Sequence, residues 1–583
     1  MSPICFLIRA LDSEQLGRLD NTLLPQEMLM ELLISNIKDR DRFFDENGNP
    51  LEIKRWRGVR CNSREEIIGI SWSNYNDSFF RGNGFIDFQW IPRTVTSFGI
   101  PGNKLQGELR LASLPESMKD LHIQRNDFHG ALDFDRLPAY FRGIDCSSNR
   151  FDGCVDFQSL PASLESFNLS KNSFTGSIQI DGFPESLLYV DLSENQFTGT
   201  LQLEKLPESL REFNVSKNNL TGSICTSSLP ENLEYFLVAD NQFEGSIDLR
   251  NLPIELAIFD VSTNHLGECI NFKFIPETLA TISLQCNQFR GPIKLGQFPK
   301  VLTDLAFSQN AFTGEIVWRE MHAHVESINF HQNTLEGNII LEEIPRSVIS
   351  LNLSKNRFCG DVNLSALPSG AMYVVLSSNI LTGWVHLDKL PLSLLMLDIQ
   401  ENRFTGTIQL GNLPASLRLL DISMNTFTGS ISMSGLPETM KILRFYRNEI
   451  SGGVCLKSCP SKMQRLHGFT NRLQGTLEIN MLPARMLSLL LSENFLSGSL
   501  DLCKLPASFE YLDLSSNTFS GDITFHDIPM TMKKINLASN AFSGKVIINP
   551  LPAGGIVLNL QNNTIDTIHD GNGEPVVGEW ILI

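Results

Sequence analysis

Residues 160–180 read LPASLESFNLSKNSFTGSIQI, and this stretch contains the unit from which most of the chain is built. Its asparagine, Asn172, recurs every 23 residues from Asn103 to Asn563, at 21 positions and without insertion or deletion. A proline stands eleven residues before each of these asparagines, except where His322 replaces it, and a glycine follows four residues after all but two. A period of roughly 20 to 50 residues is typical of a solenoid, whose units bury their apolar faces against their neighbours. We therefore expect one long domain of stacked coils.

The apolar residues of one unit predict its local structure. Phe167 and Leu169 alternate with polar residues, as do Ile178 and Ile180, so each coil should carry two short strands on different faces. The asparagine lies where the chain turns inward, and its amide can bond backbone groups of adjacent coils. We expect a continuous, buried ladder of asparagine side chains, with a stacked column of mostly phenylalanine two residues after it.

The pattern Leu164-x-x-Phe167-x-Leu169-x-x-Asn172-x-Phe174-Thr175-Gly176-x-Ile178 resembles the leucine-rich repeat, and its second half is similar to the plant-type subclass. The 23-residue unit is one shorter than the roughly 24 residues typical of that subclass. Leu-Pro-x-Ser-Leu also replaces the usual Ile-Pro and small helical turn, a feature similar to long protozoan leucine-rich repeat proteins. The resemblance implies a mainly β solenoid of about 21 coils, whose concave face, made by the first strands, usually carries binding.

The same resemblance extends to the cap at the amino terminus. Trp56-Arg57-Gly58-Val59-Arg60-Cys61 is similar to the plant-type cap signature, although only Cys61 of the usual cysteine pair is present. Residues 24–34 predict a helix with Pro25 in its first turn. We assign residues 1–90 to a helical N-terminal cap region, 91–567 to the leucine-rich repeat solenoid and 568–583 to a C-terminal cap.

Composition narrows the functional classes. A formal net charge of −18 and a pI near 5.1 argue against a surface that follows nucleic-acid phosphates. Eleven cysteines without any CxxC pair indicate a reducing compartment. The apolar run Ile4 to Ile8 is too short for a signal peptide or a membrane span. We therefore expect a cytoplasmic protein without membrane insertion, with an extracellular or cell-surface location as the alternative.

Two adjacent coils, those of Asn448 and Asn471, depart most from the small polar residues expected on the exposed strand positions. Arginine and aromatic side chains are enriched at binding hot spots. Our candidate binding residues are Arg444, Tyr446, Arg447, Arg465, His467, Phe469 and Arg472. We expect them to bind an acidic or phosphorylated protein segment. The alternative is ordinary variation in a tolerant surface column.

Other features favour structural interpretations. Four of the seven tyrosines share one strand position, which also fits β-surface packing; they are Tyr189, Tyr235, Tyr373 and Tyr511. His322, His324 and His331 occupy different faces of a coil, so we expect no metal site. Cys459 replaces a core residue and is expected to be a small hydrophobe. The glycosylation sequons at Asn168, Asn214 and Asn352 follow automatically from the repeat.

No phosphate-binding loop, nucleophile elbow or paired acid and base is present, so we expect no catalytic residues, no cofactor and no enzyme activity. The leading hypothesis is a non-catalytic scaffold or adaptor that binds a protein or peptide on the concave face. One alternative is an exported, receptor-like ectodomain that recognises a peptide or glycan. Another is a structural member of a larger assembly. The oligomeric state is not encoded in any pattern we recognise.

Overall fold

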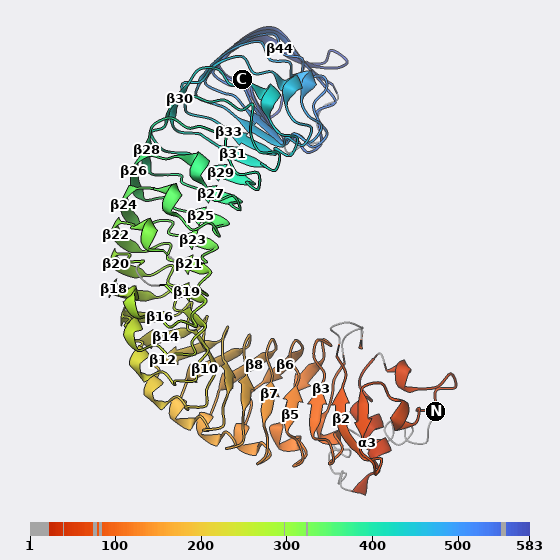
Figure 1. Ribbon diagram of the computed structural model, residues 1–583. Helices are drawn as coiled ribbons and strands as arrows, with labels where there is room; N and C mark the ends of the chain where they lie inside the picture. The colour runs from red at the N-terminus through yellow and green to blue at the C-terminus, as the bar shows by residue number, and fades with distance from the viewer. Residues whose placement is uncertain are drawn as a thin grey trace. The chain divides into compact units, whose positions relative to one another are not determined.

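The structure is a computed structural model that describes residues 23–38, 40–73, 79–80, 84–295, 298–321, 324–549 and 556–583 (Figure 1). It comprises two compact units, Met1–Phe289 and Arg290–Ile583, each a stack of coils. The apolar run Ile4 to Ile8 and the proline-column positions His322 and Pro552 lie outside the described residues.

The first strand of each coil pairs in parallel and in register with the first strand of the next, and we call the result the first sheet of that unit (Figure 1). In the amino-terminal unit an antiparallel pair from the cap opens this sheet. Its strands are β1 Val59–Cys61, β2 Ile67–Ser71, β3 Ser97–Gly99, β5 Asp120–His122, β7 Gly143–Asp145, β9 Ser166–Asn168, β11 Tyr189–Asp191, β13 Glu212–Asn214, β15 Tyr235–Leu237, β17 Ile258–Asp260 and β19 Thr281–Ser283. In the carboxyl-terminal unit they are β21 Asp304–Ala306, β23 Ser327–Asn329, β25 Ser350–Asn352, β27 Tyr373–Val375, β29 Met396–Asp398, β31 Leu419–Asp421, β33 Ile442–Arg444, β35 Arg465–His467, β37 Ser488–Leu490, β39 Tyr511–Asp513, β41 Lys534–Asn536, β43 Val557–Asn559 and β45 Ile581–Leu582.

The second strand of each coil follows the asparagine and in most coils pairs in parallel with its neighbours. The pairing is interrupted at two places in the carboxyl-terminal unit, where only the isolated bridges Trp384–Thr405 and Ser430–Ser451 join successive coils. In the amino-terminal unit these strands are β4 Gln106–Glu108, β6 Asp127–Gly130, β8 Arg150–Cys154, β10 Ser173–Ser177, β12 Gln196–Gly199, β14 Asn219–Gly222, β16 Gln242–Ser246 and β18 His265–Cys269. The remaining second strands are β20 Gln288–Pro292, β22 Ala311–Glu315, β24 Thr334–Asn338, β26 Arg357–Asp361, β28 Ile380–Thr382, β30 Thr405–Thr407, β32 Thr426–Thr428, β34 Ser451–Gly452, β36 Arg472–Gly475, β38 Phe495–Gly498, β40 Thr518–His526, β42 Ala541–Asn549 and β44 Thr564–Asp570.

Most coils close with one short 3₁₀ turn before the next proline, where a parallel repeat must reverse direction. In the amino-terminal unit, together with two turns of the cap, these are η2 Asp41–Phe43, η3 Ile53–Arg55, η4 Phe88–Trp90, η5 Leu111–Ser113, η6 Phe134–Arg136, η7 Phe157–Ser159, η8 Ile180–Gly182, η9 Leu203–Lys205, η10 Thr226–Ser228, η11 Leu249–Asn251 and η12 Phe272–Phe274. In the carboxyl-terminal unit they are η13 Trp318–Glu320, η14 Leu341–Glu343, η15 Leu364–Ala366, η16 Met433–Gly435, η17 Leu456–Ser458 and η18 Ile479–Met481. The predicted mainly β solenoid of about 21 coils with two short strands per coil is confirmed.

The asparagine ladder joins each coil to the one before it. The Nδ2 group of Asn195 donates to the carbonyl oxygen of Leu169 in the preceding coil, at 3.0 Å, and to those of Leu192 and Ser193 in its own. Its Oδ1 accepts from the backbone N–H of Phe174, at 3.0 Å. One side chain thus bonds four backbone groups at once, and the N–H of Phe174 has no other partner among the bonds that join the described coils.

The turn that presents the asparagine has a conformation that the repeat pattern did not predict. The residue immediately before each ladder asparagine has a positive φ, and only the first of these residues is glycine. Lys171, for example, has a φ of 55°, and its N–H donates to the carbonyl oxygen of Ser193 in the next coil, at 2.9 Å. The left-handed conformation is therefore maintained by hydrogen bonds between coils rather than by glycine.

The amino-terminal cap takes the place of a coil before the first repeat. Its helix, α3 Gln26–Leu33, lies within the predicted range of residues 24–34 but begins after Pro25, and it buries four of its apolar residues. Trp72, which follows β2, accepts a hydrogen bond from Nδ2 of Asn103 through its carbonyl oxygen, at 2.7 Å. The N–H of Phe80 donates to Oδ1 of the same asparagine, at 3.2 Å. The cap therefore makes the two contacts that a preceding coil makes elsewhere in the ladder.

Replacing a ladder asparagine by leucine should destabilise the coils next to it first. Asn195→Leu removes four hydrogen bonds and leaves the N–H of Phe174 without a partner, while the three carbonyl groups each keep a second donor, so the free energy of unfolding should fall by about 1–3 kcal/mol. Hydrogen exchange should accelerate around residues 169–197 before other coils. Asn219→Leu, the same change at an exposed position, is the control. Equal acceleration throughout the chain would contradict this expectation.

Residues before the ladder asparagines should tolerate glycine better than a β-branched residue. Ser516 has a φ of 53° and an exposed side chain. Ser516→Val should lower the free energy of unfolding by about 1–2 kcal/mol, because a branched Cβ is disfavoured in this region, whereas Ser516→Gly should be neutral or stabilising. Denaturant melts of the two variants test this, and equal stabilities would show that the turn carries no strain.

Candidate protein-binding surface

The predicted binding residues form a band across two coils of the carboxyl-terminal unit. Arg444 ends β33, and Arg465 and His467 begin and end β35, so all three lie on the first sheet. Tyr446 and Phe469 follow at matching positions after these strands. The band runs along the strand direction, from Arg465 at the start of β35 to the turn that precedes the ladder asparagine. Its arginines are therefore spread along the band.

A stacked aromatic pair forms the centre of the band. The rings of Tyr446 and Phe469 lie 4.4 Å apart between centroids, with an interplanar angle of 7°. The Tyr446 hydroxyl donates to Oε1 of Gln400, two coils away, at 3.2 Å. Both rings are partly exposed. They therefore offer a rigid apolar platform, whose low rotamer entropy suits it to binding.

Arg444 is held by the scaffold. Its Nη1 lies 3.3 Å from Oδ2 of Asp421, a carboxylate whose residue is only 1% exposed. Asp421 also accepts hydrogen bonds from Ser423. Removing a partner from a buried charge is costly, so Arg444 is needed to balance Asp421. Its charge is only partly available to a ligand.

His467 is neutral at physiological pH. Burial, reinforced by the positive charges of Arg444 and Arg465, lowers its pKa to about 4. Nε2 of the ring lies 2.6 Å from Oγ of Ser488 in the next coil and shares a hydrogen bond with it. His467 therefore contributes a polar edge to the band and no charge.

Arg472 departs from the expected arrangement. It begins β36, a second strand, and its Nη2 lies 2.9 Å from Oε2 of Glu449, so it does not share the first sheet with the other residues. The position directly after the asparagine begins the second strand in most coils, which explains the error. Arg447, exposed with a φ of 52°, and Arg465, partly exposed, make no ion pair among the described residues. They carry the uncompensated charge of the band.

Two strand positions differ from the expectation that small polar residues mark the exposed surface. Several serines two residues before the asparagine are buried, including Ser170 at 5% exposure, because their hydroxyls bond Oδ1 of the residue two positions earlier. The position seven residues before the asparagine is instead open at the edge of the first sheet, and it holds the exposed cations Arg418 and Lys441. The step from buried Leu417 and Met440 to these residues was the signal in the sequence.

The other singled-out residues make local contacts. Tyr189, Tyr373 and Tyr511 are exposed by 44%, 44% and 39% on the first sheets. His331 shares a hydrogen bond with Ser354, Nδ1 to Oγ at 2.7 Å. Burial raises the pKa of the Cys459 thiol to about 12, in keeping with a small hydrophobe. All ten cysteines within the described ranges are free thiols.

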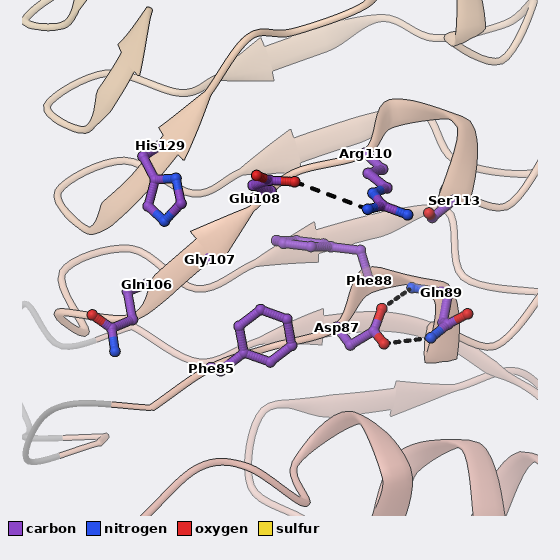
Figure 2. Close-up of a pocket in the computed structure, with 10 residues that line it drawn as sticks. All are labelled: Phe85, Asp87, Phe88, Gln89, Gln106, Gly107, Glu108, Arg110, Ser113 and His129. Atoms are coloured by element: carbon purple, nitrogen blue, oxygen red, sulfur yellow. Dashed lines mark hydrogen bonds and ion pairs between the residues drawn. The ribbon is translucent and has the colours of Figure 1, made fainter. Parts of the chain in front are cut away.

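A hollow of about 620 Å³ lies near the amino-terminal cap, where η4 meets β4 and β6 (Figure 2). Phe85 and Phe88 line its middle, and Glu108 and Arg110 lie next to each other on one side, with Oε2 and Nη2 4.0 Å apart (Figure 2). A Cβ on Gly107 would lie 2.6 Å from the Phe85 ring, so the ring packs directly on that glycine. Asp87 is bonded to Gln89. Both carboxylates of the hollow thus have local partners, and His129 from β6 completes its lining.

The described residues also bear on metal binding and on membrane insertion. No group of three or more His, Cys, Asp or Glu residues there is arranged to hold a metal ion. None of the helices described has both the length and the apolar character needed to cross a bilayer.

Comparison with solved structures establishes the fold as the leucine-rich repeat solenoid. No protein-family model and no curated protein matches the sequence. The ectodomain of the Arabidopsis receptor kinase HAESA, solved with the peptide hormone IDA and the co-receptor SERK1, matches with a TM-score of 0.65 and 22% identity over 89% of this chain and 94% of that one. A TDR receptor gives 0.65 and 22% over 88% and 94%. The plant peptide hormone receptor RGFR1 with RGF2 gives 0.62 and 22% over 88% and 95%.

The lowered pKa of His467 predicts a specific pH dependence. The unfolded chain binds a proton at His467 near pH 6.5, whereas the folded chain binds it only near pH 4. His467 therefore contributes stability that is present above pH 6.5 and lost as the pH falls towards 4, on the order of 2 kcal/mol. The free energy of unfolding of the wild type, minus that of His467→Gln, should therefore fall by about 2 kcal/mol as the pH is lowered from 6.5 towards 4. Denaturant melts of both proteins at several pH values measure this difference.

Asp398 provides an internal check of opposite sign. Burial raises its pKa to about 6, with a further contribution from the nearby charge of Asp421. Its contribution is present at low pH and lost as the pH rises towards 6, so Asp398→Asn should gain stability relative to the wild type with rising pH. The same sign for both variants would contradict the assignment.

Proposed function

We propose that the protein is a non-catalytic binding scaffold whose carboxyl-terminal unit holds an acidic or phosphorylated segment of a partner protein on its first sheet. The observation that carries this proposal is the pairing of uncompensated arginines, Arg447 and Arg465, with the stacked Tyr446 and Phe469. In a chain of net charge −18, such a surface is unusual. Arginine forms bidentate hydrogen bonds to carboxylate and phosphate groups, and an aromatic platform adds contact area.

Support from known proteins is general. The leucine-rich repeat solenoid is typically a binding scaffold, and the HAESA and RGFR1 structures contain peptide ligands. In this chain the structural ion pairs of Arg444 with Asp421 and of Arg472 with Glu449 reduce the available charge. The proposed contact with the acidic group therefore depends on Arg447 and Arg465, while Arg444, His467 and the aromatic pair shape the surface between them.

An exported ectodomain is the second candidate, favoured by the extracellular character of the similar receptor structures, several of which are described as ectodomains. The free cysteines and the unpaired Cys61 favour a reducing compartment. In the sequons at Asn168 and Asn352 the serine hydroxyl bonds Oδ1 of the asparagine, at 2.8 and 2.6 Å, so these residues have a structural role on the first sheet. N-linked glycan on the native protein at either site would favour export.

Charge reversal of the two uncompensated arginines should abolish partner capture. Arg447→Glu with Arg465→Glu should weaken binding by about 2 kcal/mol or more, because an attractive contact becomes repulsive. Quantitative affinity purification from native lysate, with wild type and variant compared side by side, measures the loss. We leave Arg444 unchanged because its removal would strand buried Asp421.

The matched control is Arg346→Glu with Arg357→Glu, which makes the same charge change at exposed positions outside the first sheet. This control should retain the partner set of the wild type. An identical partner set for all three proteins would overturn the proposed site.

A further inference from the structure

An unusual row of apolar side chains leads across the first sheet to the proposed site. Tyr373, Met396, Leu419 and Ile442 begin four consecutive strands, β27 to β33, and are Cα partners in register. The next partner in the row is Arg465. Tyr373 is 44% exposed and the other three are partly exposed.

This row is longer than any apolar run at the same strand position of the amino-terminal unit, where Tyr189, Tyr235 and Ile258 begin β11, β15 and β17 but Glu212 stands between the first two. In β3, β5, β7 and β9 of the amino-terminal unit, the position holds small or polar residues. These residues are Ser97, Asp120, Gly143 and Ser166. The fold therefore does not need apolar residues there, so the run from Tyr373 to Ile442 is a local feature of this surface.

Residues at the sheet edge widen the row. Met372 and Leu395, one position before β27 and β29, are partly exposed. Side chains at these two positions meet between neighbouring coils, as shown by Lys533, whose Nζ lies 5.3 Å from the centre of the Tyr511 ring. The apolar row is therefore two side chains wide at its β27 and β29 end.

At the other end the same edge becomes basic. Arg418 and Lys441 are both exposed, and the N–H of Lys441 donates to the carbonyl oxygen of Arg418, at 2.8 Å. The N–H of Arg465 donates to the carbonyl oxygen of Lys441, at 3.0 Å. Within the described ranges none of these three cations forms an ion pair. Three successive coils thus place unpaired positive charges beside the end of the apolar row.

We propose that this strip binds a protein segment in which apolar side chains are followed by carboxylates, with the apolar part over β27 to β33 and the acidic part over Arg418, Lys441 and Arg465. The inference rests on the proposed function and names the kind of segment bound and its orientation. Apolar burial supplies contact energy, and the unpaired cations select for acidic side chains and fix the direction. The strip spans four strand spacings, about 19 Å, which corresponds to roughly six residues of extended chain.

The test begins with a displayed library of random peptides about 12 residues long, selected on the full chain. Selected sequences should contain an apolar run adjoining Asp or Glu. Affinities of synthetic copies are then measured by fluorescence polarisation against the wild type and three variants. The strip variant is Met396→Thr with Leu419→Thr, the arginine variant is Arg447→Glu with Arg465→Glu, and the control is Leu188→Thr with Ile258→Thr in the amino-terminal unit.

The inference expects roughly tenfold weaker binding for both the strip and the arginine variants, with the control unchanged. Loss only in the arginine variant overturns the strip and leaves the proposed function intact. Loss only in the strip variant overturns the contact of the acidic half with Arg465 and removes support from the proposed function. Unchanged binding in both, or no enriched peptide, overturns the strip, and unchanged binding in both also removes support from the proposed function.

Orientation has its own readout, which is independent of how well the variants fold. A photoreactive benzophenone group at the apolar end of a selected peptide should cross-link to the wild-type chain within residues 372–420. The same group at the acidic end should cross-link within residues 418–470. The reverse pattern, or cross-links confined to the amino-terminal unit, would overturn the inference.

Discussion

Each coil is joined to the preceding one through the side chain of a single asparagine. Oδ1 of Asn195 accepts from a backbone N–H of the previous coil, and Nδ2 donates to a carbonyl of that coil as well as to two of its own. These bonds have fixed lengths and directions, so neighbouring coils cannot slide by a residue without losing them. This constraint explains why the 23-residue period runs without insertion, and why columns of equivalent residues remain aligned across each sheet.

The strands and the asparagine ladder were predictable because hydrophobic alternation and the 23-residue period can be read directly from the order of residues in the sequence. The pattern around Phe167 and Leu169 predicts the first strand, and that around Asn172 the ladder. Other features depend on contacts that no column reveals. The positive φ of Lys171 is produced by hydrogen bonds from the next coil, and no glycine signals it. Ser170 is a small polar residue of the kind expected at the surface, but it is buried, and its hydroxyl bonds Oδ1 of Asn168.

The candidate surface divides in the same way. The sequence indicates its location on two adjacent coils, because arginine and aromatic residues are rare at the exposed strand positions. The sequence does not indicate which of its charges are paired or neutral. Arg444 and Arg465 are both arginines of a first strand, so the sequence does not distinguish them. In the structure Arg444 is paired with the buried carboxylate of Asp421, whereas Arg465 is not. His467 beside two arginines cannot be recognised as neutral from sequence, because burial is the largest cause of its lowered pKa. The exposure of Arg418 and Lys441 is signalled only by the change from apolar Leu417 and Met440 to charged residues, because these positions precede the alternating pattern of the first strand.

The constant period also has a consequence for how this surface can change over generations. Unequal recombination between repeats removes or adds whole 23-residue units, and every column stays in register on both sides of the junction. One such event between β27 and β33 would lengthen or shorten the apolar row by one side chain, and the hydrogen bonds of the ladder asparagines in the joined coils would remain. Recognition length can thus evolve in discrete steps, separately from point mutations that alter the chemistry of each side chain in the row.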